Sequence, residues 1–493
     1  MSDPRRHLHT AAQVRELDRR AIAGGIGGYE LMQRAARACW RLLAGRGART
    51  DAIVIVCGPG NNGGDGYEIA RLAKADGRDV QVFSVGGLPR DGDAKRACQA
   101  WREDGGGIAA FAGSLPPADW VVDAVFGTGL SRALSSEALD AVRAIHIAKR
   151  NGARVLAVDV PTGLDASTGA LASGEAVHAD LTVSFIGQKL GLYTGDGPAV
   201  CGERHFDDLA VVAHDDVPPA AHLQSEADLR TWLAPRSRTA HKGDHGHVLI
   251  VGGNHGMMGA ALIAARAALR SGAGLVSVAT RDAHVAALTA AQPELMCRGG
   301  DDVVSLRPLL RKVDVIAIGP GLGTDDWART LLSAALDSGK PLVIDADALN
   351  LLAGEPVTLN DAILTPHPGE AARLLGCRNA AVQGDRLAAL HAIEQRFGAT
   401  VVLKGAGTLV SGPSCPAVCP YGNPGMAVGG MGDALTGIIV ALRGQGLDAH
   451  HAAQTAVLVH ALAADRAAAR GERGLLPSDV VAELRTIVNP ERR

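Results

Sequence analysis

The sequence from Gly422 to Asp433 reads Gly-Asn-Pro-Gly-Met-Ala-Val-Gly-Gly-Met-Gly-Asp, and the apolar run 434–442 follows directly. Dense glycines allow backbone N–H groups to turn toward one point, and the apolar run predicts a helix whose positive end faces that point. Phosphate is the expected ligand. Asp433 falls in the first helical turn, where the helix dipole favours the carboxylate, so it can accept a proton from a hydroxyl beside a bound phosphate. The stretch indicates phosphoryl transfer with Asp433 as base; the alternative is a glycine-rich turn capped by an ordinary aspartate.

Further glycine-rich and acidic loops follow strands that we expect in the same half of the chain. The strands are apolar runs at 248–251, 275–279, 313–318, 341–344, 362–364 and 400–403. The loops include Gly-Pro-Gly-Leu-Gly at 319–323, Asp-Ala-Asp-Ala-Leu-Asn at 345–350, Thr-Pro-His-Pro-Gly-Glu at 365–370 and Lys-Gly-Ala-Gly-Thr at 404–408. Gathered at one sheet end with 422–433, they predict the pocket of a nucleotide-dependent phosphotransferase. No Walker-type Gly-Lys-Ser/Thr loop is present, and His367 alone could be a loop histidine packed between prolines.

The first half of the chain alternates strands and helices. Thr10 caps an expected helix, a second helix covers about 29–43, and apolar runs at 52–57, 80–85, 120–126, 154–160 and 181–186 are separated by helical stretches such as 66–75 and 136–150. This alternation predicts a parallel sheet covered on both faces. The polar, proline-bearing stretch around 211–224 then predicts a boundary between two domains, at residues 1–215 and 223–493.

Polar residues in the first half follow the ends of these strands, where loops of a parallel sheet converge. They are the loop 61–66 (Asn-Asn-Gly-Gly-Asp-Gly), Asp123 with 126–130, and Asp159 with the segment after it. Residues 58–63 match the dinucleotide fingerprint, but the second strand ends in Val-Gly-Gly without the acidic residue that would bind a ribose, so we do not expect a standard NAD-cofactor role. Oxygens of Asn62, Asp123 and Thr162 could hold potassium or magnesium, or form only a hydrogen-bonded turn network. Asp159 is either an acid/base or a helix cap.

Composition narrows the class of protein. The 493 residues are enough for two domains, possibly three, and 47% of them are apolar. Lys+Arg 49 against Asp+Glu 52, with only 3% aromatics, gives no reason to expect a nucleic-acid partner. The N-terminus lacks the apolar core of a signal peptide and no run approaches a membrane span, so we expect a cytoplasmic enzyme with no membrane partner. The eight cysteines should be free thiols, and the histidines at 241, 245, 247 and 255 are not favoured as a metal site.

Four of these segments resemble a known family. Residues 61–66, Phe-Gly-Thr-Gly-Leu at 126–130, 365–370, and 422–433 in full are similar to the bifunctional NAD(P)H-hydrate repair enzymes, over nearly the whole chain. The resemblance implies an α/β protein with an N-terminal Rossmann-like three-layer domain, an NAD(P)H-hydrate epimerase, followed by a ribokinase-like α/β domain, an ADP-dependent NAD(P)H-hydrate dehydratase. It implies K⁺ in the epimerase, ADP as co-substrate, and the hydrates of NADH and NADPH as substrates. We also expect Mg²⁺ in the dehydratase domain and a homo-oligomer.

The resemblance also implies roles for particular residues. Asp433 and Asp159 are the catalytic residues, and Asn62, Asp123 and Thr162 bind potassium. The hydrate in the epimerase contacts Asn61, Asn62, Gly63, Gly64, Asp65, Gly127, Thr128, Gly129, Leu130, Ser131, Arg132, Ala133 and Asp159. The hydrate in the dehydratase contacts Ala260, Gly321, Gly323, His367 and Asp433, and the nucleotide contacts Lys404, Gly405, Ala406, Gly407, Thr408 and Gly432.

Three positions depart from the family pattern, and two other functions stay open. Glu68 stands where an apolar residue is usual, Val428 where a small polar residue is common, and Thr162 where serine is frequent. A ribokinase-like small-molecule kinase with a regulatory N-terminal domain would give a stable phosphorylated product. A binding or scaffold role for the N-terminal domain would give no potassium-dependent epimerisation.

Overall fold

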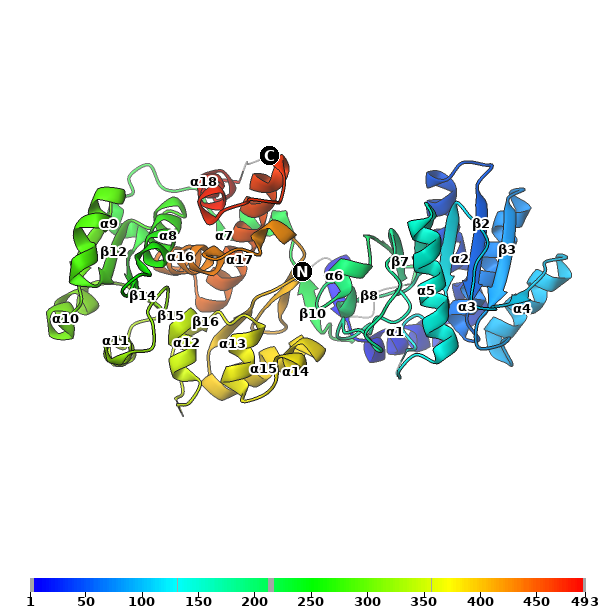
Figure 1. Ribbon diagram of the computed structural model, residues 1–493, viewed down its shortest axis with the longest axis horizontal. Coiled ribbons are helices and arrows are strands. Elements are labelled where there is room, and N and C mark those ends of the chain that lie inside the picture. The colour runs from blue at the N-terminus through cyan, green and yellow to red at the C-terminus, as the bar shows by residue number, and fades with distance from the viewer. Residues whose placement is uncertain (1–3, 131, 212–216, 356, 491–493) are drawn as a thin grey trace. The chain divides into compact units, whose positions relative to one another are not determined.

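The computed structural model describes residues 4–130, 132–211, 217–355 and 357–490. The chain divides into two compact units, Met1–His222 and Leu223–Arg493. Both are mixtures of helices and mainly parallel strands, as the sequence predicts (Figure 1). Within the part of the chain that the structure describes, no helix combines the length and apolar character that a membrane span requires.

The first unit is built on a seven-stranded parallel sheet. Its order is β4 (Ala109–Ala110), β3 (Asp79–Ser84), β2 (Ala52–Cys57), β5 (Trp120–Ala124), β6 (Arg154–Val158), β7 (Leu181–Phe185) and β9 (Glu203–Asp207). The five expected strands are confirmed within two residues at each end, because strands buried on both faces are continuous apolar runs. The sequence did not predict β4 and β9, which lie at the two edges of the sheet.

Helices cover both faces of this sheet in three layers. The helices of the unit are α1 (Ala11–Ala23), α2 (Gly28–Arg46), α3 (Asn61–Ala75), α4 (Gly92–Glu103), α5 (Ser136–Arg150) and α6 (Gly197–Val200). One core joins the sheet to α2, α3 and α4, and the other joins its opposite face to α5. Outside the sheet, β1 (His7–His9) pairs with β8 (Gln188–Lys189) and with β10 (Ala221–Leu223).

Helix α3 begins five residues earlier than we predicted. The segment 61–66 is not a loop but the first turns of the helix, which starts directly after Gly60. Several glycines at a helix start argue against a helix from propensity alone. Close packing explains them: a Cβ at Gly63 would lie 1.9 Å from the carbonyl oxygen of Gly58, and one at Gly66 would lie 2.7 Å from the Cβ of Ala124. The helix can therefore approach the sheet only with glycines at these positions.

The second unit contains a longer sheet. Seven parallel strands run in the order β13 (Met296–Gly299), β12 (Leu275–Thr280), β11 (His247–Val251), β14 (Val315–Ile318), β15 (Leu342–Ile344), β16 (Ala362–Leu364) and β17 (Thr400–Leu403). The hairpin strands β18 (Thr408–Val410) and β19 (Ala417–Cys419) continue it in antiparallel order. The six expected strands are confirmed, but the antiparallel pair and β13 were not predicted. Residues 404–408 are consequently a hairpin connection rather than the start of a crossover.

One apolar core packs helices of this unit against the sheet. The helices are α7 (Leu229–Trp232), α8 (Met258–Arg270), α9 (Val285–Ala291), α10 (Val303–Lys312), α11 (Asp326–Leu336), α12 (Ala346–Leu352), α13 (Pro368–Leu375), α14 (Asn379–Gly384), α15 (Arg386–Phe397), α16 (Met431–Gly444), α17 (Ala449–Ala467) and α18 (Pro477–Ile487). Side chains of α8, α16 and α17 form this core with one face of the sheet. Nine consecutive residues of α16, 434–442, are buried, which fixes the helix that begins beside Asp433.

Candidate active sites

The first site lies where α3 begins and where β5 and β6 end. A Cβ at Gly127 would lie 2.7 Å from Asp159 Oδ2 and 2.9 Å from Asn62 Oδ1, so these three residues meet at one point. Thr128 donates its backbone N–H and its hydroxyl to Asp159 Oδ2, at 2.8 and 2.5 Å. The buried Nδ2 of Asn62 has no hydrogen-bond partner among the described residues. The structure thus brings together the residues that the sequence places after different strands.

Asp159 also contacts a residue that sequence reasoning missed. The ammonium of Lys189, a side chain that is 1% exposed, lies 2.5 Å from Asp159 Oδ1 and donates to the carbonyl oxygen of Phe185. Burial would raise the pKa of Asp159, but this ammonium holds it below its usual value. Asp159 has a left-handed backbone, with φ of 68°, which is strained for a residue other than glycine and is frequent at functional sites.

A second carboxyl group near Asp159 has its pKa shifted in the opposite direction. Burial first, and then the charge of Asp159, raises the pKa of Asp65 well above its usual value. Asp18 of α1, another residue that we did not predict, belongs to the same cluster, and burial raises its pKa to about 6. Two carboxyl groups whose pKa values are shifted in opposite directions can divide the roles of proton acceptor and proton donor.

The proposed potassium ligands form a buried group of oxygens. Asp123 is fully buried, and its Oδ1 lies 2.7 Å from Thr162 Oγ1, which is also 3.2 Å from the carbonyl oxygen of Phe126. Asp123 also accepts the backbone N–H groups of Val125 and Thr162, and Thr162 Oγ1 accepts that of Phe126, so hydrogen bonds hold these oxygens in place. Burial raises the pKa of Asp123 to about 6, against the hydrogen bonds from Thr162. A monovalent cation suits such a donor set.

The remaining predicted residues of this site have other positions. Gly64 lies against α2 and α4, since a Cβ there would meet Met32 Cε at 2.5 Å, so it does not face Asp159. Asn61 and Gly129 are exposed, as are Arg132 and Ala133, and no contact joins them to Asp159 in the described part of the chain. Leu130 donates its N–H to Gly127, and Ser131 lies outside the described residues.

The second site is centred on a buried ion pair between two loops of the second unit. Lys404 Nζ lies 2.8 Å from Asp345 Oδ1 and 3.8 Å from Glu370 Oε2, while Asp345 Oδ2 accepts a hydrogen bond from Thr436 at 2.8 Å. Against the effect of burial, each charge stabilises the other: the pKa of Asp345 is lowered and the pKa of Lys404 is raised. A Cβ at Gly432 would lie 3.2 Å from Lys404 Nζ, so this ammonium reaches the start of α16.

Asp433 lies in the first turn of α16, as predicted, but its electrostatics differ from our expectation. We expected the helix dipole to favour the carboxylate. Burial first, and then the negative charge of Asp345, raises the pKa of Asp433 to about 6, with Lys404 opposing the shift. A carboxyl group with this pKa is still mostly ionised at neutral pH and is better matched to accepting and returning a proton.

The glycine-rich stretch forms a narrower anion site than predicted. The N–H of Gly422 donates a hydrogen bond to Asp465, and that of Gly425 donates to Asn423. The N–H groups of residues 426–428 donate to carbonyl oxygens within the same segment. The N–H groups at the start of α16 have no carbonyl group one turn earlier in the helix. Residues 429–432, and not the whole of 422–433, are therefore the part that can hold a phosphate.

The other predicted residues of the second site adjoin the same loops. A Cβ at Gly321 would lie 3.1 Å from the Cβ of Ala260, and Gly323 donates its N–H to Asp347 at 2.8 Å. Asp347 in turn raises the pKa of Asp433, which links this loop to the proton acceptor.

His367 has a structural role that its sequence position did not reveal. Its Nδ1 accepts the N–H groups of Gly369 and Glu370 at the start of α13, and Glu370 accepts a hydrogen bond from the backbone N–H of His367 at 2.7 Å. The ring is half-exposed, and its Nε2 lies 3.4 Å from Glu370 Oε1.

A buried arginine supports the loop 404–408, for which we predicted nucleotide binding. Arg386 donates to the carbonyl oxygens of Leu403 and Lys404 at 3.1 and 3.2 Å, and Thr408 donates to Gly405 at 2.8 Å. Ala406 is exposed and Gly407 is buried in the same turn. Arg386 was not predicted, because one arginine in a helix carries no pattern.

Comparison with known proteins identifies the family. The family described as NAD(P)H-hydrate dehydratase matches residues 248–486, and the family described as YjeF-related protein N-terminus matches residues 28–191. The bifunctional NAD(P)H-hydrate repair enzyme Nnr of Coxiella burnetii is 45% identical over 493 residues, covering 98% of this chain and 99% of that protein. This chain belongs to the bifunctional NAD(P)H-hydrate repair enzymes. The resemblance and the fold predicted from the sequence are thereby confirmed.

Solved structures similar to this repair enzyme match its second unit. A ribokinase-like superfamily protein from Enterococcus faecalis is 31% identical, with a TM-score of 0.52, covering 55% of this chain and 95% of that chain. An ADP/ATP-dependent NAD(P)H-hydrate dehydratase from Bacillus subtilis, co-crystallised with ATP/Mg²⁺, is 29% identical, with a TM-score of 0.48, covering 53% of this chain and 96% of that chain.

The structure explains one of the departures in this repair enzyme. Glu68 is buried, and its carboxylate accepts a hydrogen bond from the Tyr29 hydroxyl at 2.6 Å and lies 3.1 Å from Arg71. The charge of Glu68 is therefore compensated. It acts on the first site through its negative charge, which contributes to the raised pKa of Asp65. Val428 is 38% exposed on the glycine-rich stretch and contacts nothing that explains its identity.

Proposed function

We propose that the second unit, residues 223–493, dehydrates the S form of NAD(P)H hydrate at the expense of ADP. The observation that supports this most strongly is the position of Asp433 beside the positive start of α16 and within the field of the Asp345–Lys404 pair. A base, a phosphate site and a lysine next to each other are the groups that phosphoryl transfer needs.

The chemistry begins with a poor leaving group. The hydrate carries a hydroxyl group on the carbon beside the ring nitrogen, and hydroxide leaves reluctantly. Asp433 accepts the hydroxyl proton while the oxygen attacks the terminal phosphorus of ADP, whose bond to the bridging oxygen breaks and releases AMP. The ring nitrogen then expels phosphate, and the adjacent carbon loses a proton to give NAD(P)H. Lys404 and the N–H groups of residues 429–432 stabilise the transferring charge.

A magnesium ion would fit this site through few protein ligands. Mg²⁺ keeps several waters and is usually held by one or two carboxylates together with nucleotide phosphates. No group of three His, Cys, Asp or Glu side chains in the described ranges is arranged to hold a metal, whereas Asp347 and Asp433 are close enough for their charges to interact. We propose Asp347 as its protein ligand, which leaves Asp433 free to act as the base; when bound, the ion would neutralise phosphate charge.

We further propose that the first unit, Met1–His222, interconverts the R and S hydrates. Inversion at the carbon that bears the hydroxyl group requires water to leave and to return on the opposite face. Asp65 can donate a proton to the departing hydroxyl group and the ionised Asp159 can take one from the returning water. We propose K⁺ on Asp123, Thr162 and Asn62, where it would keep the buried Asp123 ionised.

One experiment tests both activities. Purified protein is incubated with mixed R and S hydrates and with ADP, ATP or no nucleotide, and the recovery of nicotinamide absorbance is followed together with chiral chromatography. We expect AMP, phosphate and NAD(P)H, with complete consumption of both forms in the presence of potassium. A stable phosphorylated hydrate would instead indicate a kinase, and consumption of the S form alone, with the R form left over, would reject the epimerase. The homo-oligomer and the cytoplasmic location stay predictions, which light scattering and cell fractionation test.

A further inference from the structure

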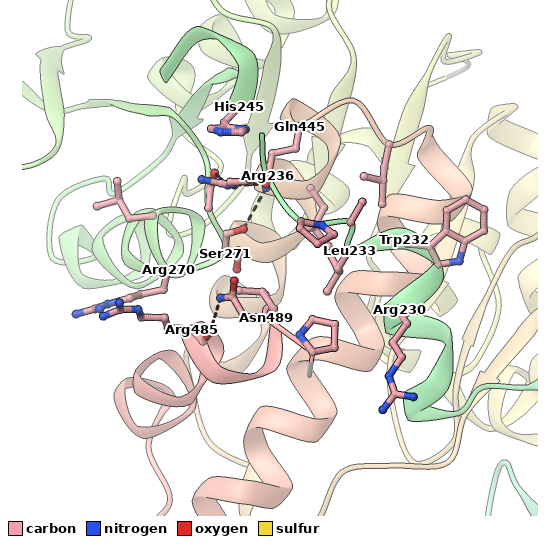
Figure 2. A pocket seen from close by; sticks show the side chains of 18 residues that line it. Arg230, Trp232, Leu233, Arg236, His245, Arg270, Ser271, Gln445, Arg485 and Asn489 are labelled. Atoms are coloured by element: carbon pink, nitrogen blue, oxygen red, sulfur yellow. Dashed lines mark hydrogen bonds between the residues drawn. The ribbon is translucent and has the colours of Figure 1, made fainter. Parts of the chain in front are cut away.

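A cavity of about 820 Å³ lies in the second unit, at the other end of α16 from Asp433 (Figure 2). Its lining includes Leu442 and Gln445 at the end of α16, and Ser271 and Gly272 just after α8. Because α16 has 14 residues, each contributing about 1.5 Å, the cavity is roughly 20 Å from the proposed active site. It is therefore a separate site, for which the dehydration reaction has no use.

The charge of this cavity is strongly positive. Arg230, Arg236, Arg270 and Arg485 line it, and no aspartate or glutamate of the described residues does. The whole chain has a formal net charge of −3, so this surface departs from the average. Within the described ranges, the guanidinium groups of Arg230, Arg270 and Arg485 form no ion pair. They are free to bind an anion from solution.

The fourth arginine removes an obstacle to anion binding. Carbonyl groups at the end of a helix repel negative charge. Arg236 donates to the carbonyl oxygen of Gly272 and to Gln445 Oε1, and Gln445 Nε2 donates to the carbonyl oxygen of Ser271 at 3.1 Å. The carbonyl groups of Ser271 and Gly272, just after α8, therefore already accept hydrogen bonds from protein groups.

An unused donor lies at the centre of the lining. The side chain of Ser271 is 2% exposed, and its Oγ has no hydrogen-bond partner among the described residues. A buried hydroxyl group without a partner costs free energy, which a bound acceptor would recover. Ser271 lines the cavity, and Figure 2 shows it between Arg236 and Asn489.

An aromatic and apolar wall completes the site. Trp232 stacks with His451, with ring centroids 3.6 Å apart, and stays 37% exposed. Figure 2 places Trp232 and Arg230 on the opposite side of the cavity from Arg270 and Arg485. We propose that this cavity binds a phosphate-bearing nucleotide, with phosphates on Arg270, Arg485 and Ser271 and its base on Trp232. Its volume is in the range of small-ligand pockets.

The test counts ADP sites on the full chain. Equilibrium dialysis of radiolabelled ADP against wild type should give two sites, and crystals soaked in ADP should show it in the cavity as well as at Asp433. In Arg270→Ala/Arg485→Ala the cavity site should weaken about tenfold or more, because each charge-assisted contact to phosphate is strong. Pyrophosphate should compete for this site and neutral adenosine should not.

The control is Arg307→Ala, which removes an exposed arginine of α10 that does not line the cavity. It should leave both sites unchanged, and thermal melting checks that all variants fold. One ADP per chain in wild type, or two sites that are equally strong in the double variant, would overturn the proposal. Loss of dehydratase activity alone would not affect it, since the count concerns the second site.

Discussion

Protonation of Asp433 should cause dehydratase activity to fall at low pH, and this fall is the acid limb of the pH–rate profile. Its pKa of about 6 arises from burial and from the charge of Asp345. With this value, about ten elevenths of the molecules carry the ionised base at pH 7, half at pH 6 and about one eleventh at pH 5. We expect kcat/KM for the S-hydrate to fall about tenfold between pH 7 and pH 5. Asp345 does not produce this limb, because Lys404 keeps its pKa low.

Two neighbouring charges allow this limb to be moved in opposite directions. Asp347 raises the pKa of Asp433, so Asp347→Asn should move the limb to lower pH; the amide oxygen can still accept the N–H of Gly323. Lys404 lowers that pKa, so Lys404→Met should move the limb to higher pH, in addition to weakening nucleotide binding. If the midpoint of the limb moves by one on the pH scale, the lost charge–charge interaction is worth about 1.4 kcal/mol.

The assay follows nicotinamide absorbance in initial-rate measurements with S-hydrate and ADP from pH 5 to pH 8. Asp433→Asn, which should fold normally and be inactive, supplies the spontaneous rate to be subtracted at each pH. A rate that is constant between pH 5 and pH 7 would refute the assignment of Asp433 as the base. A limb that stays in place in Asp347→Asn and Lys404→Met would show that another group titrates.

Three further predictions concern the first unit. Lys189→Met should raise the pKa of Asp159 and slow R-to-S conversion most at low pH, as chiral chromatography across pH would show; an unchanged profile would contradict the ion pair's role. Gly127→Ala places a methyl group 2.7 Å from Asp159 Oδ2 and should reduce epimerisation at least tenfold while dehydration continues. Gly63→Ala places one 1.9 Å from a backbone oxygen and should destabilise this unit by about 1–3 kcal/mol in urea unfolding, whereas wild-type stability would mean that α3 shifts freely.

The sequence predicts the strands well but the first helix of the site poorly. Runs such as 52–57 and 362–364 are apolar throughout, because both faces of a parallel strand are buried, and the observed bounds agree. The start of α3 was missed because glycines lower helix propensity, and only the close packing around Gly63, Gly64 and Gly66 explains why they are needed. Tertiary packing decided a structure that local preference opposed.

The charged partners of the site were also beyond sequence reasoning. Asp159 comes at the end of a predicted strand, and Asp433 lies at the start of a predicted helix. Both could therefore be proposed as site residues from the sequence. Lys189 lies 30 residues after Asp159 in a two-residue strand, where nothing in the pattern marks it. The raised pKa of Asp433 depends on burial and on Asp345, which only the folded chain brings near. Sequence thus indicates which groups react, and folding determines their proton affinities.

The buried helix α16 has a consequence for how this protein tolerates change. Its amides should be among the slowest to exchange with deuterium, because the helix opens only when most of the surrounding domain unfolds. Asp433 lies in the first turn of this helix, so the most rigid part of the domain fixes its orientation. Substitutions in the exposed loops can therefore change which molecules enter the site, while the reactive carboxylate oxygen of Asp433 keeps its position.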